Sequence, residues 1–230
     1  MQRSASFELW YALAAILFVT LAYIIVSIVL RGFPPAFSFY GHTMGVFGFS
    51  LMLMTETLYS LRKRTHSSRW GRMAGWLQFH IFTGLVGPYM VLLHTAWVFN
   101  GLAGIVMLLT VLIVLSGFIG RYIYTAIPRT PGGEEVALEQ LNLMVQRLET
   151  GLARLEHAPD DATPDTTSRK QTLAEMRSRR DRLKKQIGAF QTTRRLFSLW
   201  HTLHIPLGLS LFALAFFHIG AAIYYATLLH

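Results

Sequence analysis

The sequence predicts an all-α integral membrane protein with five transmembrane helices and a cytoplasmic antiparallel helical hairpin between the fourth and the fifth. Three observations support this fold class. Hydrophobic residues make up 53% of the 230 residues and charged residues only 14%, whereas soluble proteins contain about 25% charged residues. Five apolar segments reach the roughly 20 residues that a helix needs to cross the hydrocarbon core. The net charge is +9, and the cations gather where cytoplasmic loops are expected.

The five predicted spans cover about residues 9–30, 41–61, 75–99, 102–127 and 196–228. The first lies where a signal peptide would lie. Its apolar stretch is longer than the usual core of a signal peptide and no small-residue cleavage site follows it, so we expect a retained helix. The second span is the least apolar, because it contains His42 and Glu56.

The distribution of Lys and Arg predicts the orientation. The loop after the second span holds five cations within residues 62–72, the first loop holds only Arg31, and the third loop holds none. Lys and Arg accumulate in cytoplasmic loops. We therefore expect the N-terminus and the long fourth connection in the cytoplasm and the C-terminus outside, with a bacterial inner membrane as the location.

The predicted soluble part is residues 129–195, between a region with the first four helices (1–128) and a region with the fifth (196–230). Its first arm, 133–157, is mainly acidic, and its second arm, 168–186, is mainly basic. Apolar residues of the first arm recur every three or four positions, at Leu138, Leu141, Val145, Leu148, Leu152 and Leu155. This period and the complementary charges predict a coiled-coil hairpin with arms about 30 Å long. A disordered basic linker is the alternative.

The chain contains no cysteine. This excludes a disulfide framework, a thiolate zinc site, an iron–sulfur cluster and a covalently attached c-type haem. The basic loop and the basic second arm account for the positive charge, so we expect no nucleic-acid partner.

Four histidines share one spacing. His80 and His94 lie in the third predicted span, and His204 and His218 lie in the fifth. Fourteen residues of α-helix rise about 21 Å and return within about 40° of the same direction. Because both helices run from inside to outside, His80 is expected level with His204, and His94 level with His218.

Two opposed imidazoles at two depths predict two bis-histidine haem sites, an inner one (His80/His204) and an outer one (His94/His218). Imidazole is an iron ligand, and ionisable residues within membrane helices usually have a function. A structural role for any single histidine is the alternative. Zinc would require a third or fourth ligand nearby, and the sequence shows none.

Flanking residues are consistent with a flat cofactor. Gly84 follows His80 by four residues and Gly208 follows His204 by four, and Gly87 lies seven before His94. Their lack of a side chain would leave room for a porphyrin edge, although small residues also serve ordinary helix packing. Arg121, near the inner end of the fourth span, is a candidate partner of the haem propionates, as are Arg72 and Arg195. Attraction of these cations to lipid phosphate is the alternative.

The segment Phe79-His80-Ile81-Phe82-Thr83-Gly84, followed by Leu92-Leu93-His94, resembles the third helix of the ferric reductase/NADPH oxidase transmembrane domain. The segment Trp200-His201-Thr202-Leu203-His204-Ile205-Pro206-Leu207, with Phe216-Phe217-His218, resembles that family's fifth helix. The same paired spacing occurs in quinol-oxidising cytochromes b. The resemblance implies two non-covalent b haems that carry electrons across the bilayer, with the four histidines as axial ligands.

The chain differs from that family in two ways. It carries no Gly-rich nucleotide motif after its last span, so we expect that it does not oxidise NADPH by itself. It also inserts the hairpin, a candidate docking site for a cytoplasmic partner. We therefore expect an electron-transfer subunit of a larger redox complex, with a cytochrome or dehydrogenase as partner.

A membrane quinone is a further candidate partner, and Glu56 and His201 are candidate groups for its proton chemistry. Two rival functions remain open. One is a self-sufficient quinol dehydrogenase or metal reductase. The other is a non-redox membrane anchor or assembly scaffold in which the histidines are structural.

Overall fold

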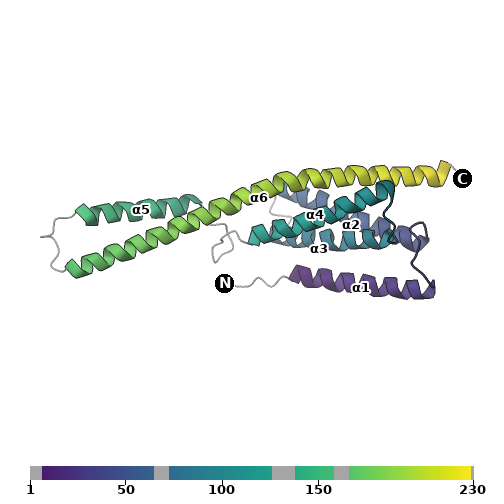
Figure 1. Cartoon of the computed structure of the whole chain (residues 1–230), viewed down its shortest axis with the longest axis horizontal. Helices are drawn as coiled ribbons and strands as arrows, with labels where there is room; N and C mark the ends of the chain where they lie inside the picture. The colour runs from purple at the N-terminus through teal and green to yellow at the C-terminus, as the bar shows by residue number, and fades with distance from the viewer. Residues whose placement is uncertain (1–6, 65–72, 126–137, 158–165, 229–230) are drawn as a thin grey trace. The chain divides into compact units, whose positions relative to one another are not determined.

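The computed structural model describes residues 7–64, 73–125, 138–157 and 166–228, which form helices and connecting turns without any strand. The helices, shown in Figure 1, are α1 (Phe7–Val29), α2 (Phe39–Arg64), α3 (Met73–His94), α4 (Gly101–Thr125), α5 (Leu138–His157) and α6 (Thr166–Leu228). The predicted basic loop after α2 and the predicted turn between the hairpin arms lie mostly outside these ranges.

Five of the described helices, α1, α2, α3, α4 and α6, are long and apolar enough to cross a membrane. This agrees with the prediction of an all-helical membrane protein. The second hairpin arm and the fifth span, predicted as separate segments, are parts of one helix, α6, of 63 residues. Pro206 lies within it, and helices tolerate proline where neighbouring groups satisfy the freed carbonyl.

The chain forms two compact units. The first comprises Met1–Phe118 together with Leu203–His230, and the second comprises Ile119–Thr202. The four spaced histidines all belong to the first unit.

In the first unit, α2 packs closely against α3 because glycines face each other. A Cβ atom on Gly48 would lie 2.8 Å from the carbonyl oxygen of Gly87, so any side chain at either position would separate the helices. Small residues permit such close approach in membrane proteins, where dispersion contacts drive helix association. Helix α1 also lies against α3, and the hydroxyls of Thr20 and Tyr89 form a hydrogen bond between them.

The core of the first unit is apolar. Its buried members are Met52 of α2, Val106 of α4, and Leu211 and Ala215 of α6. The ring of Phe49 packs edge-on against Phe216, with centroids 5.4 Å apart. Leu211, only 1% exposed, lies seven residues from His204 and seven from His218, so this core lies midway between the two histidines of α6.

Helix α3 ends at His94, five residues before the end that hydrophobicity predicted. The backbone turns at Ala96 and Trp97, whose φ angles are +47° and +65°. The Thr95 hydroxyl accepts a hydrogen bond from the Trp97 amide and so stabilises the turn. Hydrophobicity did not reveal this end because Trp97 and its neighbours are as apolar as the helix.

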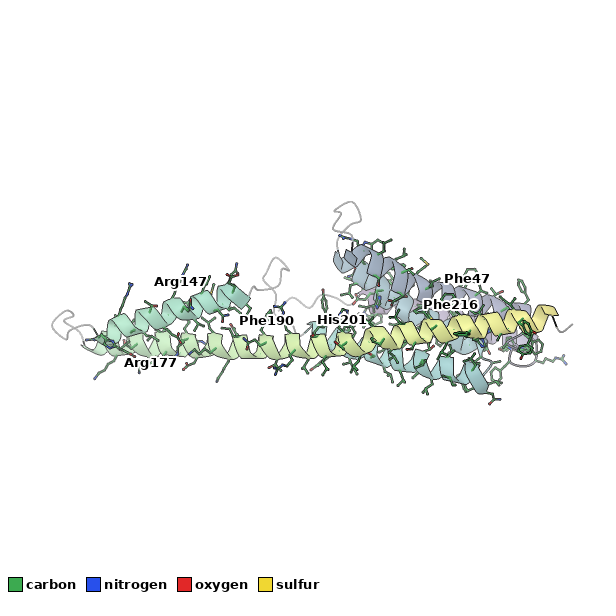
Figure 2. All side chains as sticks on the ribbon, turned by 90° about the horizontal axis from the view of Figure 1, so that it is seen from above. Phe47, Arg147, Arg177, Phe190, His201 and Phe216 are labelled. Carbon is green, nitrogen blue, oxygen red and sulfur yellow. The ribbon has the colours of Figure 1, made fainter. Side chains whose placement is uncertain are left out.

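In the second unit, α5 lies beside the N-terminal part of α6. Lys184 pairs with Glu149, and Arg177 pairs with Glu156, both at 2.7 Å. Val145 and Leu152, two members of the predicted repeat, are buried. Figure 2 shows the side chains of this region, including Arg177. Two ion pairs thus join the acidic and basic segments, whereas the antiparallel coiled-coil hairpin and its placement in the cytoplasm stay predictions.

Candidate functional site

Both histidines of α6 lie on its buried side. Gly208, Leu211 and Ala215 are buried, and His204 and His218 continue the same row in partly buried positions. The spacing of three or four residues keeps the row on one face of the helix. The 14-residue spacing therefore directs both imidazoles towards the interior of the first unit.

Helix α3 has a matching row. His80 and His94 are its ends, and Thr83 and Gly87 lie between them in buried positions. Thr83 is fully buried, and its hydroxyl lies 2.7 Å from that of Thr55 on α2. The two hydroxyls satisfy each other within the apolar interior.

We call His94 and His218 the outer tier, after their predicted position near the outer side of the membrane. The Nδ1–H of His94 donates a 2.8 Å hydrogen bond to the carbonyl oxygen of Gly41. His218 lies in the neighbourhood of His94. The ring of His42 is also near, with its centroid 6.4 Å from that of His94.

We call His80 and His204 the inner tier, after their predicted position near the cytoplasmic side. Nδ1 of His80 lies 3.2 Å from the carbonyl oxygen of Thr55. The next residue, Glu56, has a carboxylate oxygen 3.9 Å from where a Cβ on Gly208 would lie, one turn from His204. Adjacent residues of α2 therefore contact the surroundings of both histidines, which indicates that His80 and His204 lie at a similar level.

These hydrogen bonds determine which ring nitrogen of each histidine carries the proton. A carbonyl oxygen can only accept, so the ring nitrogen beside it must carry the proton. In a neutral ring Nε2 is then the nitrogen without a proton, the atom that would coordinate a metal. Nδ1 of His204 lies 2.9 Å from the hydroxyl of Ser116 on α4, which orients this ring as well. Metal-bound histidines characteristically have their second nitrogen fixed in this way.

The three glycines that the sequence singled out differ in their surroundings. A Cβ on Gly87 would lie 2.9 Å from the carbonyl oxygen of Gly48, so helix packing explains this glycine. A Cβ on Gly84 would come no closer than 3.5 Å to another atom, and one on Gly208 no closer than 3.8 Å. A methyl group at either position would make ordinary van der Waals contacts, so the described protein atoms do not require glycine there.

The available donor set fits a metal that is held by pairs of imidazoles. Among the described residues, no group of three or more His, Asp or Glu side chains could enclose a metal ion. A haem iron requires only two protein ligands, since the porphyrin supplies four nitrogens. Two pairs of histidines match the number of protein ligands that two such groups would need.

Two further candidates belong to the second unit. The ring of His201 stacks on Phe197 and on Trp200, with centroids 5.9 and 5.7 Å away. Arg121 is partly buried. Their predicted roles beside a haem stay predictions, and Arg72 lies outside the described residues.

Four contributors were not found by sequence reasoning, namely Gly41, Gly45, Ser116 and His42. Gly45 lets the His94 ring approach α2, since a Cβ there would lie 2.9 Å from the ring's Cγ atom. The spacing of Gly41, Gly45 and Gly48 resembles the small-residue pattern of close helix pairs and could have pointed to this contact. Nothing in the sequence near Ser116 indicates its bond to His204.

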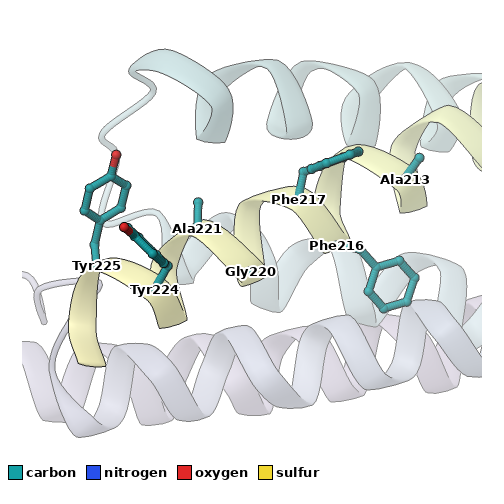
Figure 3. Close-up of a pocket in the computed structure, with 7 residues that line it drawn as sticks. All are labelled: Ala213, Phe216, Phe217, Gly220, Ala221, Tyr224 and Tyr225. Carbon is teal, nitrogen blue, oxygen red and sulfur yellow. The ribbon is translucent and has the colours of Figure 1, made fainter. Parts of the chain in front are cut away.

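A hollow of about 690 Å³ lies along the C-terminal part of α6. Figure 3 shows its lining residues, which are Ala213, Phe216, Phe217, Gly220, Ala221, Tyr224 and Tyr225. All of them come from α6, so the hollow is a lateral face of this helix.

No protein-family model, curated protein sequence or solved structure matches the chain.

Proposed function

We propose that the chain is a membrane-embedded di-haem b-type cytochrome that carries electrons across the bilayer as a subunit of a larger redox complex. The observation that supports this best is the repeated orientation of His80 and His94, whose Nδ1 atoms each lie beside a backbone carbonyl oxygen of α2, 14 residues apart. Histidines with purely structural roles do not require this repeated orientation.

In this proposal His80 and His204 hold the inner haem b, and His94 and His218 hold the outer one. A bound haem supplies one-electron chemistry. The protein orients the imidazoles through Gly41, Thr55 and Ser116, and the apolar core around Leu211 excludes water between the tiers. Gly84 and Gly208, where no described neighbour requires a glycine, lie one turn from His80 and His204.

The orientation of the chain follows the distribution of Lys and Arg. The N-terminus and the unit that contains α5 face the cytoplasm, and the C-terminus lies outside the bacterial inner membrane. The helical hairpin of α5 and the N-terminal part of α6 offers a docking surface to a cytoplasmic partner, and a dehydrogenase or another cytochrome completes the electron path.

A reduced-minus-oxidised absorption spectrum with haem quantitation of the purified chain tests this function. Two b haems per chain are expected. A folded preparation that remains free of haem after expression with an adequate haem supply would overturn the proposal and favour the scaffold alternative.

Single variants assign the sites. His94→Ala and His218→Ala should each remove one haem, the same one in both cases, whereas His80→Ala and His204→Ala should remove the other. His42→Ala is the matched control, because His42 is near the outer tier but outside both proposed ligand pairs. Retention of two bis-histidine haems in His94→Ala would contradict the assignment.

Direct reduction distinguishes the subunit from a self-sufficient enzyme. Turnover of a quinol analogue with an external acceptor should require a partner; such turnover by the isolated chain would favour the self-sufficient quinol dehydrogenase. Turnover of an external metal substrate by the isolated chain would favour the metal reductase.

A further inference from the structure

Three hydroxyl groups at the junction of α1 and α2 are buried without a hydrogen-bond partner among the described residues. They belong to Tyr23, Ser27 and Tyr40. Tyr23 is only 5% exposed. A buried hydroxyl without a partner destabilises a fold, and native proteins contain few of them. Three in one place therefore indicate a missing ligand with hydrogen-bonding oxygens.

A hollow of about 340 Å³ lies at this cluster. Its lining residues are Tyr23, Ile24, Ser27, Ile28, Gly32 and Phe33. Small-ligand sites have volumes from about 300 Å³ upwards and combine apolar walls with a few polar groups. This hollow has both features, since two of its lining residues carry the unpaired hydroxyls and the others are apolar.

The walls are suited to a flat ring. The rings of Tyr23 and Phe33 are inclined by only 23°, with centroids 6.5 Å apart. The ring of Tyr40 lies 6.3 Å from that of Tyr23. No charged side chain is among the lining residues, so the hollow lacks the cations that a phosphate headgroup would require.

The cluster adjoins the outer tier. Tyr40 immediately precedes Gly41, whose carbonyl accepts the hydrogen bond from His94. A ligand that contacts Tyr40 is therefore separated from an outer-tier imidazole by one backbone residue and its hydrogen bond.

We propose that this hollow binds the ring of a membrane quinone or quinol. Such a molecule carries two oxygens on a flat apolar ring, and its tail remains in the lipid. Tyrosine and serine hydroxyls donate to quinone carbonyls and accept from quinol hydroxyls, so Tyr23 and Ser27 in the wall, with Tyr40 next to Tyr23 behind it, can serve both redox forms.

The redox role of this site rests on the proposed function, whereas the binding does not. A quinol oxidised here becomes a quinone and releases two electrons and two protons. A haem held by His94 and His218 would accept these electrons one at a time, and the protons would pass to water at this end of the bundle.

Binding of decylubiquinone and of a short-tailed menaquinone to the full chain in detergent tests the site. Either probe should raise the unfolding temperature. Tyr23→Phe, Ser27→Ala and Tyr40→Phe should each weaken binding of that probe about 3- to 10-fold, the loss expected for one hydrogen bond. Because each hydroxyl lacks a partner in the free protein, the three variants should leave the stability of the free protein unchanged or raise it.

Tyr89→Phe is the matched control. The Tyr89 hydroxyl is bonded to Thr20, so this change should lower the stability of the free protein and leave the probe affinity unchanged. Failure of both probes to bind, or unchanged affinity in all three hydroxyl variants, would overturn the site. Because the assay does not depend on haem, binding by a haem-free chain would refute the proposed function and retain the site. Two haems without binding would do the reverse.

Discussion

The Nδ1 atom of His94 lies 2.8 Å from the carbonyl oxygen of Gly41. Within a helix this carbonyl points towards residue 45, where any other side chain would cover it. Gly45 has none, so the imidazole ring reaches a carbonyl that already belongs to the helix. Gly41 and Thr55 are 14 residues apart on α2, as are His80 and His94 on α3. The two antiparallel helices therefore make two equivalent contacts.

Gly45→Ala should remove the outer haem and retain the inner one. The added Cβ would lie 2.9 Å from the Cγ atom of His94, a separation that forces the ring to move away from its carbonyl. Haem quantitation with a difference spectrum measures this loss. Gly75→Ala on α3 is the control, because a Cβ there meets nothing within 4 Å. Two haems in Gly45→Ala would show that the contact is dispensable.

Gly84→Ala and Gly87→Ala should affect different properties, the first the affinity for the inner haem and the second the stability of the fold. In Gly87→Ala the Cβ meets backbone and side-chain atoms of α2 at about 3 Å, and we expect a loss of about 1–3 kcal/mol in the free energy of unfolding. Gly84→Ala should leave the haem-free protein as stable as the wild type but lower the affinity of the inner haem. Chemical unfolding and haem titration of the haem-free chain separate the two effects. Equal haem affinity in wild type and Gly84→Ala would mean that the space at Gly84 is not used.

Ser116→Ala should lower the affinity for the inner haem about tenfold, which is typical when a residue that orients a metal ligand is removed. The hydroxyl lies 2.9 Å from Nδ1 of His204, and without it the ring can rotate. Stepwise haem titration, followed by absorbance, measures the change. Ser50→Ala is the control, since the Ser50 hydroxyl bonds to a carbonyl of its own helix. A lower affinity for the outer haem in Ser116→Ala would contradict the assignment of His204 to the inner tier.

Glu156→Gln should loosen the contact between α5 and α6 in a pH-dependent way. The hydrogen bond from Arg177 lowers the pKa of the Glu156 carboxyl below its ordinary value of 4.5. A depressed pKa in the folded state stabilises the fold above the ordinary pKa, and this contribution is lost as the pH falls through the lowered value. Hydrogen exchange of residues 138–157 should therefore be faster in the variant than in the wild type at neutral pH, and the two should converge as the pH falls through the lowered pKa of Glu156.

The reciprocal change, Arg177→Gln, is the control for this ion pair. It should accelerate exchange to a similar extent, and the double variant should add little, because both changes remove the same interaction. Both effects should be small and should decrease in high salt, as is usual for exposed pairs. A fully additive double variant would show that the pair does not act as a unit.

Much of the fold could be predicted from the sequence because hydrophobicity and period act locally. The apolar segments, the acidic and basic segments of the second unit and the 14-residue spacing of the histidines are each visible along one segment. The end of α3 at His94 was predicted wrongly, since the turn is set by backbone angles at Ala96 and Trp97. Ser116 and the hydroxyls of Tyr23 and Tyr40 were also missed, because their significance depends on which helices meet.

The buried layer of Met52, Val106, Leu211 and Ala215 has a consequence for energy conversion. It contains no side chain that can bind or release a proton, and it lies midway between the histidines of α6. In the proposed function an electron would tunnel through this layer. The four side chains offer no site for a proton that could compensate its charge. Each electron that crosses would therefore move net charge through the membrane dielectric, so the direction of its passage would either build up or draw on the membrane potential.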